Sequence, residues 1–173
     1  MRRLNNKAFT YVELLLAIAI MTAMVGFVSL TIGTVHRNDV NRAADKVYSS
    51  VNAGRNISLT NGSKNGWCNF TVKNGNLYCY NGPRICDSNP VNFTTQNWEK
   101  ICAKNIKLMY GASTLGEGDC LSLNFKQSTG EYNGYKTKTM LDTEAFVSGD
   151  LYIKLKSNSR EANLKITKFG KIE

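Results

Sequence analysis

The sequence predicts an α+β fold in which a long N-terminal α-helix packs on an antiparallel β-sheet head. The apolar residues of roughly the first 60 positions recur at helical spacing, and no proline interrupts them. From Gly62 onward the apolar residues alternate with polar ones instead, as in strands with one buried face. The amphipathic half of the helix can cover that buried face. We therefore divide the chain into a leader (1–8), a membrane half of the helix (9–35), an amphipathic spine (36–61) and a β head (62–173).

The first half of the predicted helix is apolar enough to suggest a membrane anchor. At 1.5 Å per residue, residues 9–35 would extend about 40 Å, more than the roughly 30 Å core of a bilayer. Arg2, Arg3 and Lys7 precede this run, which favours a cytoplasmic N-terminus and an exported head. The expected topology is thus a single pass through a membrane, with the N-terminus on the cytoplasmic side and the head outside. An ordinary anchor or a cleaved signal peptide is the alternative. An ordinary anchor would not require Glu13 or an eight-residue leader, and the small-x-small site of a cleaved signal, Ala17-Ile18-Ala19, falls inside the apolar run.

The spine helix is expected to continue to about Thr60. Its apolar stripe includes Val40, Val47 and Val51, and Asn61-Gly62 is a good stop because both residues accept the left-handed conformation. Small residues would let a sheet approach the spine closely; they are Ala43, Ala44, Ala53 and Gly54.

A β-hairpin is the clearest feature of the head. Residues 67–73 and 76–80 flank Asn74-Gly75, a dipeptide typical of two-residue hairpin turns. This turn would place Val72 opposite Leu77 and Phe70 opposite Cys79.

The rest of the head is expected to contain a loop and further strands. Residues 81–105 carry both prolines and suggest an irregular loop held by a disulfide, with a helical turn near 98–102. Three later segments alternate as strands, and their inward rows are Ile106, Leu108 and Tyr110; Leu121, Leu123 and Phe125; and Leu151, Ile153 and Leu155. A last pair, Leu164 and Ile166, precedes a tight turn near the end of the chain.

Five cysteines lie in the head, and in an exported protein they favour two disulfides with one spare thiol. The candidates are Cys68, Cys79, Cys86, Cys102 and Cys120. Their pairing cannot be read from the sequence. Zinc binding is the weaker alternative, because no two cysteines are spaced Cys-x-x-Cys and the one histidine, His36, adjoins the apolar run.

The sequence contains no recognisable catalytic or cofactor-binding motif. The acid pairs Glu117 with Asp119 and Asp142 with Glu144 have the spacing of exposed loop acids, which we interpret as solubilising. We therefore expect no enzyme, no metal and no cofactor.

The formal net charge of +9 includes a basic C-terminal hairpin. Its candidate polyanion-binding residues are Lys154, Lys156, Lys165, Lys168 and Lys171. Strand alternation places the first three on the wet face of the sheet, where they could contact phosphates without reading sequence. The alternative is that lysines only protect sheet edges and keep the head soluble.

The segment from Lys7 to Leu16, KAFTYVELLL, resembles the prepilin processing motif of type IV pilins and type II secretion pseudopilins. The resemblance implies that a prepilin peptidase cuts between Ala8 and Phe9 and methylates the new amine. It makes Glu13 the fifth mature residue, and Phe9 and Glu13 the assembly residues. Ala8 departs from the glycine more usual in that family, and the usual proline within the helix is absent.

Three later segments, residues 44–61, 121–125 and 164–172, resemble those of H-class minor pseudopilins and minor pilins. The implied function is a structural subunit, minor rather than major, of a filament that is extracellular or periplasmic after assembly. The implied partners are other pilin or pseudopilin subunits, the peptidase, an inner-membrane assembly platform, and membrane lipid before assembly. The alternative is a pilus-associated subunit for DNA uptake or adhesion, which would use the basic hairpin.

Overall fold

The computed structural model describes residues 10–62, 64–85, 97–102, 106–138, 144–147, 149–157 and 160–173, without the side chains of 27–38, 138 and 144–147. The chain forms two compact units, Met1–Arg37 and Asn38–Glu173. Each unit is described by itself below.

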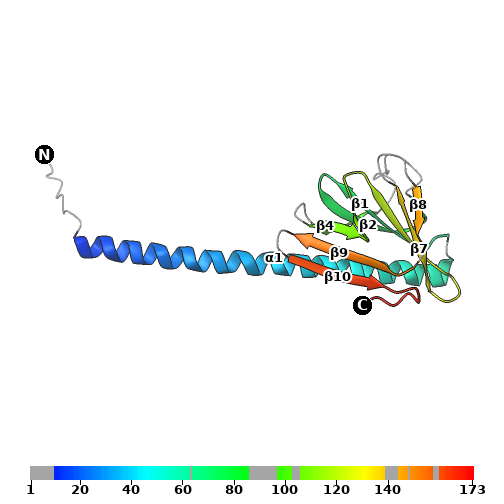
Figure 1. Cartoon of the computed structure of the whole chain (residues 1–173), viewed down its shortest axis with the longest axis horizontal. Helices are drawn as coiled ribbons and strands as arrows, with labels where there is room; N and C mark the ends of the chain where they lie inside the picture. Colours follow the sequence, from blue (N-terminus) through cyan, green and yellow to red (C-terminus); the bar gives the residue numbers. More distant parts are fainter. Residues whose placement is uncertain are drawn as a thin grey trace. The chain divides into compact units, whose positions relative to one another are not determined.

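One helix, α1 (Tyr11–Asn61), runs from the first unit into the second (Figure 1). It ends where the sequence predicts, at Asn61, and Gly62 follows with a φ of 89°. The amide of Gly62 donates to the carbonyl oxygen of Ser58 at 3.1 Å, which satisfies one of the last carbonyls of the helix.

The predicted membrane-spanning half and the single-pass location are wrong by this structure. Side chains of α1 are described over residues 11–26 and 39–61. In the described part of the chain, no helical stretch is both long enough and apolar enough to cross a membrane.

The strands form two antiparallel sheets. The larger has the order β3-β2-β1-β6-β7-β8, comprising β1 (Trp67–Lys73), β2 (Asn76–Gly82), β3 (Glu99–Cys102), β6 (Cys120–Phe125), β7 (Tyr132–Lys138) and β8 (Glu144–Val147). The smaller has the order β10-β9-β4-β5, comprising β4 (Lys107–Tyr110), β5 (Ser113–Thr114), β9 (Leu151–Ser157) and β10 (Arg160–Ile166).

The predicted fold class is therefore wrong. It was an α+β pilin fold in which one antiparallel sheet packs on a long helix whose first half spans a membrane. The unit from Asn38 onward is mostly β, and its two sheets are separate in strand pairing (Figure 1). The reason is that the alternation of apolar and polar residues determines which side chains of a strand are buried, but it does not determine which other strand pairs with it. The row at 121–125 joins the hairpin through β1, whereas the rows at 106–110 and 151–155 pair with each other.

The predicted hairpin register is confirmed. Val72 pairs with Leu77 and Phe70 pairs with Cys79. Asn74 and Gly75 have φ values of 51° and 71°, the left-handed conformation that a type I′ turn requires at both positions.

The segment after the hairpin differs from the predicted irregular loop. β2 continues to Gly82, and Glu99–Cys102 forms strand β3 on the outer edge of β2, not a helical turn. Residues 86–96 and 103–105 of that predicted loop lie outside the described residues.

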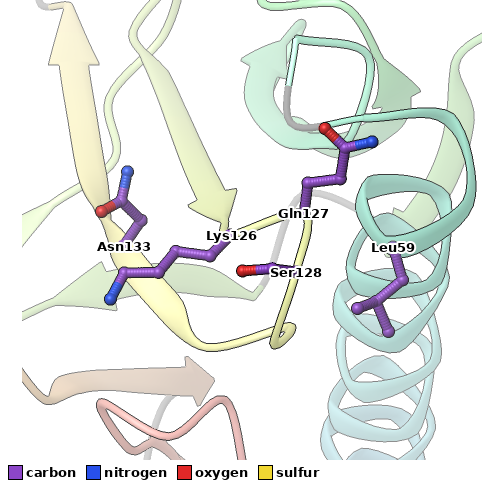
Figure 2. A pocket seen from close by; sticks show the side chains of 5 residues that line it. All are labelled: Leu59, Lys126, Gln127, Ser128 and Asn133. Atoms are coloured by element: carbon purple, nitrogen blue, oxygen red, sulfur yellow. The ribbon is translucent and has the colours of Figure 1, made fainter.

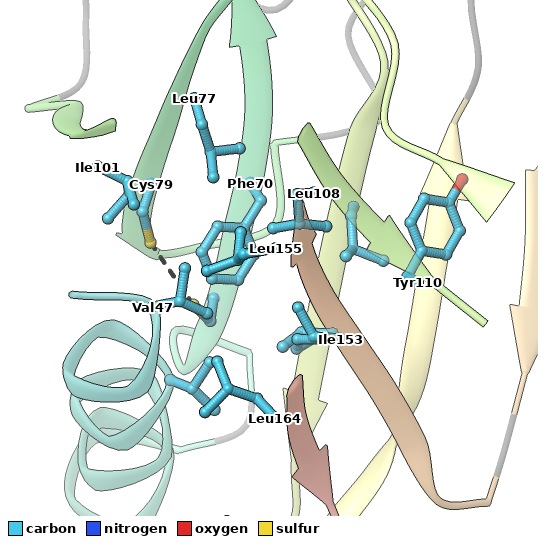
Figure 3. Close-up of a cluster of buried hydrophobic side chains, with 14 of the residues drawn as sticks. Val47, Phe70, Leu77, Cys79, Ile101, Leu108, Tyr110, Ile153, Leu155 and Leu164 are labelled. Carbon is cyan, nitrogen blue, oxygen red and sulfur yellow. Dashed lines mark hydrogen bonds between the residues drawn. The ribbon is translucent and has the colours of Figure 1, made fainter. Parts of the chain in front are cut away.

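Among the described residues, a hydrophobic core connects the spine part of α1 with both sheets. Val47 of α1, Phe70 of the larger sheet and Leu155 of the smaller one are all almost completely buried there (Figure 3). The predicted inward rows of the strands are buried as well. The close approach of α1 to β1 depends on a glycine, because a Cβ added at Gly54 would lie 3.0 Å from the Cβ of Cys68 on β1.

Candidate functional site

The N-terminal end of α1 is closed by a reciprocal set of hydrogen bonds between Thr10 and Glu13. The amide of Thr10 donates to Glu13 Oε2 at 2.9 Å, and the amide of Glu13 donates to Thr10 Oγ1 at 3.3 Å. The Thr10 hydroxyl also donates to Glu13 Oε2 at 3.0 Å. This Thr-x-x-Glu arrangement is a capping box. It gives Glu13 a local role that the sequence analysis missed, although the spacing alone could have revealed it.

The two predicted processing residues, Ala8 and Phe9, lie outside the described residues. The predicted cut would fall immediately before this cap, since Thr10 would be the second residue of the shortened chain. The cap and the predicted cut therefore adjoin each other in the sequence.

The helix surface that follows the cap is apolar on every side and uncovered. The large hydrophobic side chains between Tyr11 and Val25 are at least half exposed, from 50% at Leu15 to 75% at Tyr11. In the same stretch Glu13 is the one charged residue. Such a surface needs a covering partner, because a helix that is hydrophobic all round is normally buried.

The cysteines separate into two classes. Cys120 is disulfide-bonded, whereas Cys68, Cys79 and Cys102 are free and buried. Burial raises the pKa of the Cys102 thiol to about 11. Cys86, the fifth candidate, lies outside the described residues.

The basic hairpin predicted at the C-terminus is largely neutralised by neighbouring acids. Lys154 Nζ lies 3.2 Å from Glu161, Lys165 lies 3.3 Å from Asp150, and Lys171 lies 2.7 Å from Glu173.

Asp150 also contacts the turn after β10, since it accepts a hydrogen bond from the amide of Lys168 at 2.8 Å. That bond, with help from Lys165, holds the pKa of the Asp150 carboxyl below its ordinary value. The ammonium group of Lys168 lies 5.0 Å from the centre of the Phe169 ring.

Two other lysines remain close together on the outer face of the smaller sheet. Lys107 of β4 is directly opposite Lys156 of β9, and both are exposed. Glu161 is opposite Lys156 on the other side, but its carboxylate contacts Lys154 instead. The sequence predicted Lys156 as a polyanion contact but not Lys107, because strand pairing brings Lys107 to it.

The acids Glu117 and Asp119 are structural rather than merely solubilising. The carboxylate of Glu117 accepts hydrogen bonds from the amides of Asn74 and Gly75, at the hairpin turn. Asp119 Oδ2 accepts from the amide of Gly116 at 2.9 Å. The other acid pair cannot be compared, since Asp142 lies outside the described residues, as does the side chain of Glu144.

An open groove lies beside the end of α1, at the loop between β6 and β7 (Figure 2). Its lining residues are Leu59, Lys126, Gln127, Ser128 and Asn133. Lys126 is paired with Glu131 at 2.8 Å, which leaves this lining without a free charge. Among the described residues, no group of three or more His, Cys, Asp or Glu side chains could hold a metal ion.

Comparison with known proteins adds no relative: no family model, curated protein or solved structure matches this chain.

Proposed function

We propose that this protein is a structural subunit of a type IV pilin-like filament and that it assembles through the first part of α1. The carrying observation is the uncovered apolar surface of residues 11–26, which follows a basic leader and a capped helix start. The occupant of this surface in the proposal is the equivalent helix of neighbouring subunits. A minor position in the filament remains the preferred form of the proposal.

The energetics favour such packing. Fully burying a Leu, Ile, Val or Met side chain contributes roughly 1.5–3 kcal/mol, and these side chains retain about half of their surface or more for that purpose. Ten exposed large hydrophobic residues lie between Tyr11 and Val25: Tyr11, Val12, Leu14, Leu15, Leu16, Ile18, Ile20, Met21, Met24 and Val25. Their combined burial in a helical bundle can exceed the cost of bringing subunits together.

Proteolytic processing would control when this helix is used. A cut between Ala8 and Phe9 removes Arg2, Arg3 and Lys7 and frees an α-amino group on Phe9. In a bundle, that amine can pair with Glu13 of a neighbouring subunit, which fixes the register between the two helices.

The N-terminal sequence of the assembled protein tests the proposal. Filaments sheared from cells and analysed by mass spectrometry should contain a chain that starts at N-methylated Phe9. A strain without the prepilin peptidase should contain only the uncut chain and none in the filament fraction. Filaments that incorporate subunits with residues 1–8 intact would contradict the processing step.

A second candidate function, polyanion binding, is favoured by the Lys107–Lys156 juxtaposition. Like charges directly opposite each other destabilise a sheet, so the pair has an energetic cost that a bound anion would remove. Lys154, two positions from Lys156 on β9, is already paired with Glu161, and Lys165 farther along the sheet is paired with Asp150. The ligand would be a phosphate-rich polymer such as DNA, bound without sequence preference.

Charge substitution distinguishes this candidate from a general effect of the +9 charge. The double variant Lys107→Gln/Lys156→Gln should weaken binding of double-stranded DNA and reduce its salt dependence, measured by fluorescence anisotropy at two salt concentrations. The matched control is Lys64→Gln/Lys100→Gln, which removes the same charge away from the smaller sheet. Equal losses in the two variants, or no binding by the unmodified protein, would contradict the candidate.

A further inference from the structure

We propose that Cys68 and Cys79 form a modification site in which oxidation closes a second disulfide across the β1–β2 hairpin. The proposal concerns the folded unit from Asn38 onward and does not depend on the filament function. It names two of the five cysteines as partners, which the sequence alone could not do.

The geometry brings the two thiols together. Their sulfur atoms lie 3.6 Å apart, and both side chains are almost completely buried, at 0% and 2% exposure. Figure 3 shows Cys79 within the buried cluster. Phe70 is opposite Cys79, and Cys68 is two residues before Phe70, so both cysteines project from the same face of the hairpin. A disulfide of about 2.05 Å requires the sulfurs to approach by roughly 1.5 Å.

Beyond each other, the two thiols have few neighbours with which they could interact. Cys79 Sγ has one further weak contact, to Asn81 Oδ1 at 3.9 Å. Cys68 packs under Gly54 of α1, where the missing side chain leaves room for the hairpin. Cys120 in the same folded unit is already disulfide-bonded, so a second disulfide requires no chemistry that this unit lacks. A buried pair in contact is then a substrate for the same chemistry.

The reaction balances with an external disulfide as oxidant. The Cys68 and Cys79 thiols together lose two protons and two electrons as their S–S bond forms. The oxidant, a thiol–disulfide oxidoreductase or a small-molecule disulfide, accepts them as its own S–S bond breaks into two thiols. A mixed disulfide on one of the two cysteines is the intermediate. Since both sulfurs are inaccessible once α1 covers the hairpin, exchange would take place before this docking is complete.

Cys102 is the matched internal control. It lies on β3, the neighbour of β2, and is also buried and free. Within the described residues, no sulfur–sulfur contact like that of Cys68 and Cys79 involves it. Oxidation should therefore join Cys68 to Cys79 and leave Cys102 as a thiol.

Disulfide mapping tests the proposal directly. The full-length protein, purified without reductant and refolded from denaturant in a glutathione redox buffer, is alkylated in denaturant and digested with trypsin. Cleavage after Lys64, Lys73 and Arg84 gives peptides 65–73 and 74–84, one cysteine in each. We expect these two peptides to be joined and Cys102 to be alkylated. Alkylation of both Cys68 and Cys79, in the purified and in the refolded protein, would overturn the proposal.

Variants provide a second measurement. A disulfide closing this short loop should raise the unfolding midpoint by about 10 °C over the reduced protein. Cys102→Ser should preserve this redox-dependent difference, whereas Cys79→Ser should shrink it to the contribution of the Cys120 disulfide. If Cys79→Ser fails to fold, the peptide map of the unmodified protein still decides between the two outcomes. If a folded Cys79→Ser protein kept the full difference in unfolding midpoint between its oxidised and reduced forms, the result would contradict the Cys68–Cys79 disulfide.

Discussion

At the scale of single residues, Glu13 combines a local role and a proposed assembly role that substitutions can separate. Glu13→Gln keeps an acceptor for the Thr10 amide and thus the capping box, but removes the charge. Thr10→Ala removes the cap at a cost of about 1 kcal/mol and keeps the charge. We expect Glu13→Gln and Glu13→Ala to abolish filaments, and Thr10→Ala to reduce them only slightly.

Filament yield by sedimentation, with circular dichroism of the purified subunits for helix content, would measure these effects. Normal assembly by Glu13→Gln would show that the carboxylate acts as a cap and not as a charge in the filament. Loss of filaments in Thr10→Ala alone would lead to the same conclusion.

Glu117 marks the limit of what residue-level reasoning could predict. Its spacing from Asp119 correctly indicates a loop, but its hydrogen-bond partners lie 43 and 42 positions away, at Asn74 and Gly75. Only the approach of this loop to β1, where Val72 bridges Glu117, brings the carboxylate to the turn. Thr10 and Glu13, by contrast, are three positions apart, so that their contact was available from sequence.

At the scale of secondary-structure elements, docking of α1 on the strands depends on the missing side chain of Gly66. A Cβ at Gly66 would lie 2.2 Å from the Cα of Ser58, whose hydroxyl donates to the carbonyl oxygen of Phe125 at 2.6 Å. Gly66→Ala should therefore separate α1 from β1 and lower the free energy of unfolding by about 1–3 kcal/mol. Urea unfolding monitored by tryptophan fluorescence would measure the loss.

The comparison for this variant is Gly26→Ala, in the other unit. A Cβ at Gly26 meets nothing within 4 Å, so alanine there should leave the folded unit unchanged and favour the helix slightly. The loss in free energy of unfolding for Gly54→Ala should lie between those of the two other variants, because the added Cβ would lie 3.0 Å from the Cβ of Cys68. A Gly66→Ala protein as stable as the unmodified one would contradict the close contact.

Elements that the sequence specifies locally were predicted well, whereas their pairing was not. The end of α1, the Asn74-Gly75 hairpin and the inward rows all depend on neighbouring residues, and the structure confirms them. β3 was missed because Glu99–Cys102 has too few residues for a periodic signal. The division into two sheets was missed because it follows from which strands meet, and alternation is the same in either arrangement.

At the scale of the whole molecule, carboxyl groups that are hydrogen-bonded in the folded state should make the folded unit sensitive to acid. Three carboxyls have pKa values lowered chiefly by hydrogen bonds: Glu131 by Lys126, Asp150 by the Lys168 amide and then Lys165, and Glu173 by Lys171. In the folded protein these groups bind fewer protons than in the unfolded chain. Their contribution to stability is therefore present above the ordinary carboxyl range, about pH 4, and is lost as pH falls through the lowered values.

The urea midpoint of the protein should accordingly be flat near neutral pH and fall below about pH 4, where protonation also removes the acids that offset the net charge of +9. Asp150→Asn should lower the midpoint at pH 7 and make the decline toward acid shallower, because it removes the acceptor of the Lys168 amide and the partner of Lys165. Asp39→Asn, on the exposed surface of α1, serves as the matched control and should follow the unmodified protein at each pH. A decline of equal steepness in the unmodified protein and in Asp150→Asn would show that this acid does not link the turn after β10 to the stability of the fold.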